Sequence, residues 1–401
     1  MAVIAVLGTF DTKGQEHAFV ADIIRSKGHE TLMIDVGSGG PPSIEPDVSR
    51  YEVAAAAGLQ LQSLIDAKDR GRCVVEMSKA APVYLSKLHE AKRIDGIISL
   101  GGGGGTALGT AAMRALPLGF PKLMVSTLAS GNTEHYIGTT DIVMFPSIVD
   151  VAGLNSISKV IFSRAAHAIC GMVEMEESAE EEKPLIVASM FGNTTECINY
   201  AKSIFEAAGY EFMVFHATGT GGRLFESIIS SGRVAGVFDV TTTEWADELL
   251  GATLSAGPER MDAMSKQKLP AVVAPGCLDM ANYGERDTLP TEFEGRNIYI
   301  HNPQVTLLRT NASECAQLGK ILAEKVNANE APLAVMLPLK GISVISKEGQ
   351  PFYDPEADKA LFGAIKENCK KDIVEIDNDI NSKEFAEACA FKLLELISGR
   401  N

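Results

Sequence analysis

The sequence predicts an α/β fold of two Rossmann-like domains, each built on a parallel sheet, with a ligand cleft between them. Short runs of β-branched and apolar residues alternate with amphipathic stretches of about 10 to 15 residues, as in parallel strands joined by crossover helices. The pattern stops at an acidic run near the middle of the chain and then restarts. Glycines cluster directly after the predicted strands, where the absence of a side chain lets a ligand approach the backbone.

The first domain is expected over residues 1–175 and is the predicted nucleotide-binding domain. Its β-branched runs predict strands at 2–7, 31–36, 94–100, 122–126 and 141–145. Apolar residues at helical spacing predict helices at 16–27, 80–91 and 106–116, and a longer helix within 155–175. This alternation of strands and helices is typical of a doubly wound sheet.

An acidic stretch separates the two predicted domains. Six acids lie between Glu174 and Pro184, and the proline ends the run. Like charges favour solvent over a packed core, and proline interrupts regular structure. We therefore predict a solvated linker at 176–184.

The second domain is expected over residues 185–401. Its predicted strands lie at 185–190, 211–216, 234–240, 271–274, 297–301 and 333–337, and later helices are predicted at 357–368 and 382–397. Residues 28–40 overlay 209–222 after one extra residue, and Gly28 matches Gly209 at an offset of 209 − 28 = 181. These matches predict that one half arose by duplication of the other, with chance similarity of two strand–helix–strand units as the alternative.

Composition excludes several classes of protein. The chain has 401 residues and a formal charge of −16, from 36 Lys and Arg against 52 Asp and Glu, and no basic block is present to neutralise a nucleic acid. No apolar run approaches the roughly 20 residues that span a bilayer, and the amino terminus resembles a strand rather than a signal peptide. We therefore expect a cytoplasmic protein with a small-molecule ligand and neither nucleic acid nor membrane as a partner.

The cysteines and histidines predict neither disulfides nor a metal site. The seven cysteines are widely spaced with no CxxC pair, which indicates buried free thiols. The seven histidines show neither HxxxH nor HExxH spacing. We therefore name no metal ligand.

The strongest local signal is the run of glycines Gly101, Gly102, Gly103, Gly104 and Gly105, followed by Thr106. It follows an apolar strand and opens a helix, so free backbone N–H groups and the positive end of a helix dipole meet there. These residues are the predicted phosphate-binding loop. The run is neither a P-loop nor a full dinucleotide fingerprint, because no Asp or Glu ends the next strand. The alternative is a tight turn where helix and sheet pack closely.

The loop after the first strand supplies the charges that the glycine run lacks. Lys13 offers a cation, Thr9 offers a hydroxyl, and Gly14 ends the loop. Asp11 is suited to accept a ribose hydroxyl or to hold Mg²⁺ through water. The alternative is that Asp11 only caps the following helix.

A third loop in this half, with Ser130, Gly131 and Asn132, is predicted to be another anion-binding turn. The alternative for Asn132 is that it only caps a helix beginning near Glu134.

The second half offers a glycine-rich turn at 219–222, predicted to bind an anion by the same physics, and a candidate catalytic set. Asp239 ends a strand and Thr241 follows it, which places a carboxylate and hydroxyls at a strand tip. His216, at another strand tip, is the candidate general base. The alternatives are that the threonines only extend the strand, that Asp239 is a cap, and that His216 is structural.

The chain resembles, along its whole length, the bacterial and plant family typified by the ATP-binding inhibitory region of the tomato mosaic virus resistance protein. The matching motifs, in order, are GTFDTKG (8–14), GGGGGTA (101–107), STLASGN (126–132), SIVDVAGLN (147–155), HATGTGG (216–222), DVTTTE (239–244), SAGP (255–258) and PFYDP (351–355). The resemblance implies two Rossmann-like domains and ATP binding. The plant protein, which inhibits a viral replication helicase, has a further barrel-type domain beyond this region, so the resemblance also implies a separate barrel-type protein as a partner.

Three functions follow as hypotheses. The first is an ATP-binding protein, with or without Mg²⁺, whose phosphates lie on 101–106 and 9–14. The second is an enzyme acting on a small carboxylate or phosphorylated metabolite in the interdomain cleft, with Asp239, Thr241 and His216 as catalytic groups. The third is a regulatory binding module without turnover. A homodimer is the expected assembly, since closed symmetric dimers are the commonest oligomers.

Overall fold

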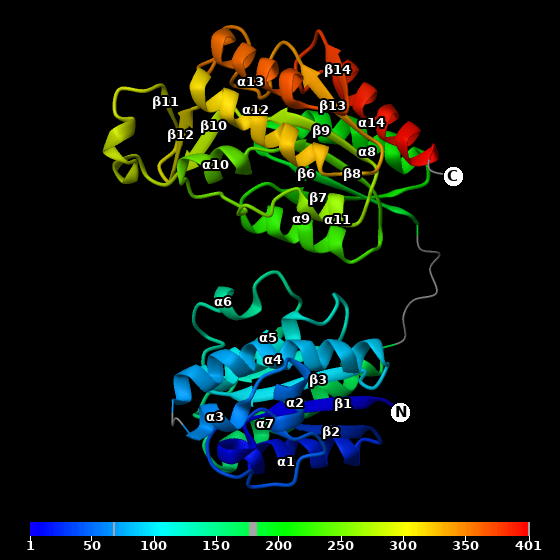
Figure 1. The fold of residues 1–401 in the computed structure, drawn as a ribbon, viewed down its shortest axis with the longest axis vertical. Helices are drawn as coiled ribbons and strands as arrows, with labels where there is room; N and C mark the ends of the chain where they lie inside the picture. Colours follow the sequence, from blue (N-terminus) through cyan, green and yellow to red (C-terminus); the bar gives the residue numbers. More distant parts are fainter. Residues whose placement is uncertain (67–68, 176–182, 400–401) are drawn as a thin grey trace. The chain divides into compact units, whose positions relative to one another are not determined.

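The computed structural model describes residues 1–66, 69–175 and 183–399. The chain divides into two compact units, Met1–Ala179 and Glu180–Asn401, and each contains a parallel sheet with helices (Figure 1). The predicted fold class of two parallel-sheet domains is confirmed. Most of the predicted linker, from 176 to 182, lies outside the described residues.

The N-terminal unit is built on a five-stranded parallel sheet of order β2-β1-β3-β4-β5. Its strands are β1 (Val3–Gly8), β2 (Glu30–Asp35), β3 (Gly96–Gly101), β4 (Lys122–Ser126) and β5 (Val143–Pro146). Its helices are α1 (Phe10–Ser26), α2 (Arg50–Ala56), α3 (Leu61–Asp66), α4 (Arg70–Glu90), α5 (Gly103–Arg114), α6 (Glu134–Ile137) and α7 (Ser156–Val173).

Side chains of successive strand residues point to opposite faces of the sheet, which divides the core of this unit into two layers. Ile4 and Val6 of β1 face the layer formed by α1 and α7, whereas Ala5 and Leu7 face α4 and α5. Figure 1 shows α1 and α4 on opposite sides of the sheet. Since both faces are covered, the central strands β3 and β4 are buried along their whole length rather than on alternate residues.

Three helices of this unit begin earlier than predicted. Helix α4 starts at Arg70 rather than at 80. Helix α5 starts at Gly103 rather than at 106, so part of the glycine run is helical. Helix α1 starts at Phe10 rather than at 16, with non-helical backbone angles at Lys13 (φ −130°, ψ 20°). The regular apolar spacing that predicts a helix appears only after this kink. The short helices α2, α3 and α6, of 7, 6 and 4 residues, are too short to show a helical period and were not predicted.

The C-terminal unit contains a six-stranded parallel sheet of order β14-β13-β9-β8-β6-β7 and a three-stranded antiparallel sheet of order β10-β12-β11. Its strands are β6 (Leu185–Met190), β7 (Glu211–His216), β8 (Val234–Thr241), β9 (Ala271–Gly276), β10 (Met280–Tyr283), β11 (Ile298–Asn302), β12 (Val305–Arg309), β13 (Leu333–Pro338) and β14 (Asp372–Ile376). Its helices are α8 (Thr195–Ala207), α9 (Thr220–Ser230), α10 (Glu244–Leu250), α11 (Asp262–Lys266), α12 (Ala312–Asn327), α13 (Pro355–Asn368) and α14 (Lys383–Ser398), with 3₁₀ turns at Gly192–Thr194, Arg286–Thr288 and Thr291–Phe293.

The two parallel sheets have the same strand order over their first five strands. Strands β6, β7, β8, β9 and β13 occupy the places of β1 to β5, and β14 adds a sixth strand. Strands β2 and β7 begin at Glu30 and Glu211, which are 211 − 30 = 181 residues apart, the offset seen in the sequence. The shared order is what a duplication predicts, although the duplication itself stays a prediction.

One of the predicted strands lies outside the parallel sheet, in the three-stranded antiparallel sheet. The predicted strand at 297–301 is β11, but it forms an antiparallel hairpin with β12. Its first two residues are half-buried and its last three are exposed, so β11 is covered less than the strands of the parallel sheet. The described residues contain no helix long and apolar enough to cross a bilayer.

Candidate functional site

The order of strands in the N-terminal sheet places its crevice between β1 and β3. The connection after β1 leads to α1 on one face and the connection after β3 leads to α5 on the other. Ligands of open α/β sheets bind at such switch points, beyond the carboxyl ends of the strands. Because β1 and β3 are hydrogen-bonded neighbours, the predicted loops 8–14 and 101–106 lie side by side.

The glycine run combines close packing with an open helix start. A Cβ on Gly101, the last residue of β3, would lie 2.7 Å from the Cα of Gly105, so the close-packing alternative holds at this position. Gly102 is the N-cap of α5 and makes no side-chain cap. Gly103 and Gly104, in the first turn, are exposed, and a Cβ on Gly103 would meet nothing within 4 Å. The first turn of α5 therefore presents uncapped amides to solvent.

Thr106 is turned away from this opening. Its side chain is fully buried, and its hydroxyl pairs with that of Ser126 at 2.7 Å. The hydroxyl of Thr106 thus joins β4 to α5, and its predicted contact with a ligand stays a prediction.

The loop after β1 is organised by Asp11. Its Oδ2 accepts a hydrogen bond from Gly39 N at 2.6 Å, which fastens the loop after β2. The N-cap of α1 is Thr9, without a side-chain cap, so the capping role considered for Asp11 is wrong. Asp11 Oδ1 is a buried atom with no hydrogen-bond partner within the described residues. Lys13 lies at the kink, and Gly14 packs against Ser43.

His17, which was not predicted, lies beneath this crevice and is completely buried. Leu100 N donates to its Nε2 at 3.3 Å, so the ring proton is on Nδ1, which donates to Lys13 O at 2.7 Å. Burial lowers the pKa of His17 and so favours the neutral ring. His17 therefore connects the end of β3 to the kink in α1.

Asp35, at the end of β2, completes the support of the loops. Its Oδ1 accepts hydrogen bonds from Phe10 N at 3.0 Å and Gly37 N at 2.8 Å, and Arg50 Nε donates to its Oδ2 at 2.7 Å. The only signal for Asp35 in the sequence is the internal repeat, which aligns it with His216.

A cavity of 480 Å³ lies at the carboxyl ends of β4 and β5. It is lined by Ser126, Thr127, Ser130, Pro146, Ser147, Ile148, Val149 and Asp150. Of the third predicted loop, Ser130 lines this cavity and Gly131 is exposed. Asn132 Oδ1 accepts a hydrogen bond from Glu134 N at 3.0 Å, so Asn132 shapes the turn before α6, although the N-cap of that helix is Thr133.

In the C-terminal unit, the glycine turn already holds an anion, which belongs to the chain itself. Glu244 Oε1 accepts hydrogen bonds from Gly219 N at 2.7 Å and Gly222 N at 3.1 Å. A Cβ on Gly222 would lie 2.2 Å from Glu244 Oε2, so the turn must be free of side chains to receive the carboxylate. The predicted anion site is present, and Glu244 occupies it.

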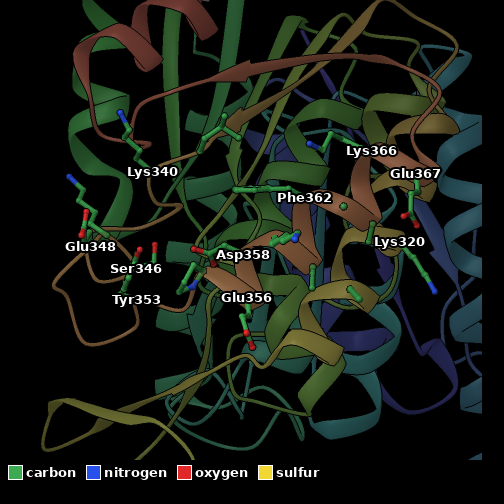
Figure 2. A pocket seen from close by; sticks show the side chains of 18 residues that line it. Lys320, Lys340, Ser346, Glu348, Tyr353, Glu356, Asp358, Phe362, Lys366 and Glu367 are labelled. Atoms are coloured by element: carbon green, nitrogen blue, oxygen red, sulfur yellow. The ribbon is translucent and has the colours of Figure 1, made fainter.

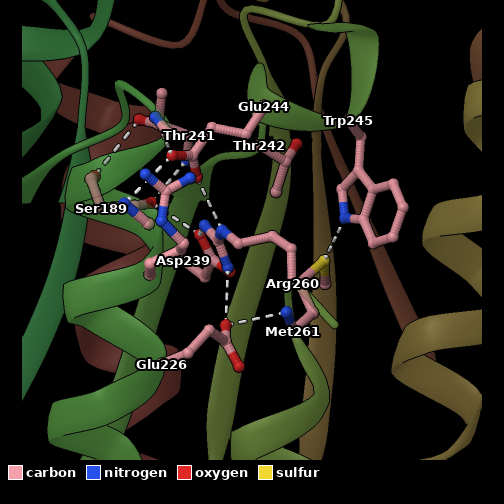
Figure 3. A network of polar contacts seen from close by, with 12 residues as sticks. Ser189, Glu226, Asp239, Thr241, Thr242, Glu244, Trp245, Arg260 and Met261 are labelled. Atoms are coloured by element: carbon pink, nitrogen blue, oxygen red, sulfur yellow. Dashed lines mark hydrogen bonds and ion pairs between the residues drawn. The ribbon is translucent and has the colours of Figure 1, made fainter. Parts of the chain in front are cut away.

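Glu244 belongs to a buried ionic network around Arg260 (Figure 3). Arg260 donates to Asp239 through two nitrogens, each at 2.7 Å, and to Glu244 at 2.8 Å and Glu226 at 3.2 Å. Burial opposes the charge on Arg260, but Asp239 and Glu244 outweigh it, and the pKa of the guanidinium lies well above its usual value. Burial raises the pKa of Glu226.

The candidate catalytic residues are not brought together. Asp239 and Thr241 are both fully buried, and Ser189 bonds to each of them, donating from Oγ to Asp239 Oδ1 and accepting from Thr241 N (Figure 3). Thr241 is the last residue of β8, as the strand-extension alternative held. His216 is exposed at the end of β7, and β6 lies between β7 and β8. A shared catalytic role for the three stays a prediction.

A second cavity, of 1040 Å³, runs along α13 in the C-terminal unit (Figure 2). Lysines and carboxylates both line it, including Lys320, Lys340, Glu348 and Glu356. Lys340 also forms an ion pair with Asp377. Because the charges are mixed, this cavity favours neither an anion nor a cation.

Within the described part of the chain, no group of three or more His, Cys, Asp or Glu side chains is placed to hold a metal ion. All seven cysteines are free, as predicted, and all but Cys369 are buried.

Two family models cover nearly the whole chain. The N-terminal domain of the Uncharacterised protein family (UPF0261) matches residues 2–178, and the C-terminal domain of the same family matches residues 183–397. A UPF0261 protein of Clostridium tetani is 49% identical over 398 residues, covering 98% of both chains. The ToMV resistance protein Tm-1 of Solanum lycopersicum is 38% identical over 417 residues, covering 97% of this chain and 55% of the tomato protein.

Likeness to solved structures is remote. The UDP-N-acetylglucosamine 2-epimerase of Rickettsia bellii, for example, has a TM-score of 0.21 and 11% identity, covering 99% of this chain and 96% of that one. Such a likeness indicates no function. The two matched domains and the close bacterial relative show that the chain belongs to the Uncharacterised protein family UPF0261.

Proposed function

We propose that the protein binds a nucleoside triphosphate, ATP or its Mg²⁺ complex, at the carboxyl edge of the N-terminal sheet. The observation that carries this proposal is the first turn of α5, where Gly103 and Gly104 are exposed and no side chain caps the helix. The triphosphate lies on these amides.

The physical basis is the positive end of the helix dipole together with free N–H donors. An anion near such a helix start gains about 0.3–1 kcal/mol, and up to about 2 kcal/mol where the geometry is partly buried. These donors carry no formal charge, so the site is compatible with a chain whose net charge is −16. The absence of side chains at Gly103 and Gly104 lets the phosphate oxygens reach the amides.

The loop after β1 supplies the charged groups. Lys13 lies at the kink of α1, and its ammonium group makes no ion pair within the described residues, so it is available to a phosphate. Asp11 Oδ1, which is buried without a partner, is suited to accept a hydrogen bond from Mg²⁺-bound water. The resemblance noted in the sequence, which implies ATP binding, supports the same ligand.

The glycine turn of the C-terminal unit is a poorer candidate for the phosphate site than the start of α5. Its glycine turn is filled by Glu244, so a ligand phosphate there would have to displace a buried carboxylate. Among the described residues, no side-chain cap closes the start of α5.

Isothermal titration calorimetry of the full chain with ATP, with and without Mg²⁺, tests the proposal. Gly103→Asp places a carboxylate in the first turn of α5 and is expected to weaken ATP binding about tenfold or more, because like charges repel. Gly103→Asn, of nearly the same size but neutral, is the matched control. Both side chains fit, since a Cβ at this position meets nothing.

Absence of ATP binding to the wild-type protein would overturn the proposal, as would equal affinities of the Asp and Asn variants. Measurement of ADP release in the same samples separates an ATP-hydrolysing enzyme from a binding module.

A further inference from the structure

The cavity at the ends of β4 and β5 contains groups that bind hydroxyls rather than phosphates. No Lys, Arg or His lines it. The hydroxyls of Ser126 and Ser147 are engaged within the protein, with Thr106 and with Val149 O respectively. The side chains of Thr127, Ser130 and Asp150 make no hydrogen bond or ion pair within the described residues and are free to bind a ligand.

Ile148 forms part of the wall of this cavity in a strained conformation. Val149 N donates to Ser147 O at 2.7 Å, which closes a three-residue turn around Ile148 with φ 63°. A β-branched residue rarely adopts this backbone conformation, and such strain is found mainly at functional sites. The side chain of Ile148 is 73% exposed, so the turn holds an apolar surface at the cavity rather than in the core.

Thr127 connects the cavity to the start of α5. Its N donates to Gly101 O at 3.3 Å, and a Cβ on Gly102 would lie 3.7 Å from its Oγ1. In a nucleotide the ribose is joined directly to the α-phosphate. A triphosphate on the first turn of α5 therefore places its ribose beside Thr127.

We propose that this cavity is the nucleoside subsite of the site in the N-terminal unit, an inference that rests on the proposed function. Asp150 accepts hydrogen bonds from the 2′ and 3′ hydroxyls of the ribose, Thr127 and Ser130 supply further polar contacts, and Ile148 packs against the base. A carboxylate that binds ribose hydroxyls is common in dinucleotide-binding folds. Here it follows β5, and no acid ends β4.

The test compares ATP, 2′-deoxy-ATP and inorganic triphosphate by calorimetry on the full chain. Wild type is expected to bind ATP about tenfold more tightly than 2′-deoxy-ATP, as for loss of a hydrogen bond to a charged group. Asp150→Asn is expected to bind the two nucleotides within about twofold of each other, and to bind triphosphate at least as tightly as wild type does. Ile148→Gly, which tolerates the positive φ, is expected to weaken binding of ATP but not of triphosphate.

Asp287→Asn is the matched control, because Asp287 is an exposed acid in the C-terminal unit and its substitution changes the net charge equally. Thermal unfolding checks that each variant is folded. If Asp150→Asn alters ATP and triphosphate binding by the same factor, or if wild type does not distinguish ATP from 2′-deoxy-ATP, the subsite is overturned while the phosphate site stands. If neither ATP nor triphosphate binds wild type, both proposals fall.

Discussion

The two units share a strand order, yet their glycine-rich helix starts are in opposite states. In the N-terminal unit, the first turn of α5 is exposed and uncapped. In the C-terminal unit, the first turn of α9 is closed by the carboxylate of Glu244, itself held by Arg260. The same physics acts in both places, since amides at a helix start attract an anion. One unit supplies that anion from its own chain, and the other leaves the position open.

The two helix starts also differ in the buried charge around them. At the start of α9, the carboxylates of Asp239, Glu244 and Glu226 surround the buried cation Arg260. Such networks are sensitive to the loss of one member, because the remaining charges stay buried without a partner. Within the described residues, the open start of α5 has no buried charge that depends on a partner. Substitutions at the two helix starts are therefore expected to change the free energy of unfolding in opposite directions.

The largest effect is expected for Arg260→Met. This change leaves Asp239 and Glu244 buried without their cation and is expected to lower the free energy of unfolding of the C-terminal unit by about 3–5 kcal/mol. The chain has one tryptophan, Trp245, which is buried in this unit, so its fluorescence during urea unfolding reports the change. Lys366→Met, which breaks an exposed ion pair with Glu375, is the control and is expected to change stability by less than about 1 kcal/mol. A similar small change for Arg260→Met would contradict the role given to the network.

Glu244→Ala is expected to open the second glycine turn. Loss of the carboxylate frees the amides of Gly219 and Gly222 and removes one partner of Arg260, for an expected loss of about 2–3 kcal/mol. Sulfate is expected to recover part of this loss by binding in the emptied turn, and to stabilise the C-terminal unit of wild type much less. Equal stabilisation of the two proteins by sulfate, followed by Trp245 fluorescence, would show that the turn is not an anion site.

Acidification is expected to affect the two units in opposite directions. Burial raises the pKa of Asp247, in the C-terminal unit, to about 7. Its folded-state pKa is therefore above its unfolded one, and its contribution to stability is largest at low pH and is lost as pH rises through about 7. Burial lowers the pKa of His17, in the N-terminal unit, so its contribution is present above the unfolded pKa of about 6.5 and is lost as pH falls.

Between about pH 7.5 and about pH 5.5, Asp247 is thus expected to stabilise the C-terminal unit by about 2 kcal/mol while the N-terminal unit loses stability. Amide hydrogen exchange, resolved by segment, measures both changes in one experiment. Asp247→Asn is expected to remove the part of the pH dependence that Asp247 contributes and to leave the part from Asp279, whose pKa burial raises to about 6. Parallel responses of the two units would contradict this assignment.

The smallest change in stability is expected for the Gly103→Asp variant. Replacement of a helical glycine and an acid in the first turn each favour α5, so this variant is expected to stabilise the N-terminal unit by about 1 kcal/mol while it weakens ATP binding. Gly103→Asn separates the contribution of charge from that of the backbone. Slower amide exchange across α5 is the expected observation, and faster exchange would show that the helix start is not complementary to an anion.

The amino-acid sequence predicts much of the fold because its signals are local. The strands at 122–126, 185–190 and 211–216 have their predicted bounds, since each contains a short apolar run of the kind typical of strands. The antiparallel arrangement of β11 was not predicted, because the direction of a strand depends on its pairing partner rather than on its own residues. The start of α1 was misplaced because the kink at Lys13 interrupts the helical period.

The sequence by itself determined the parallel-sheet architecture, the division into two domains and the glycine-rich turns after the strands, because strand period, helix period and turn residues are properties of short segments. Tertiary structure alone decided which turn stays open. Glu244 reaches Gly219 across 25 positions of the chain, and Arg260 holds it from 16 positions further on, while α5 has no side-chain cap within the described residues. These long-range contacts decide whether the amides at a helix start bind the chain's own carboxylate or are open to an external phosphate. No local pattern in the sequence predicts such contacts.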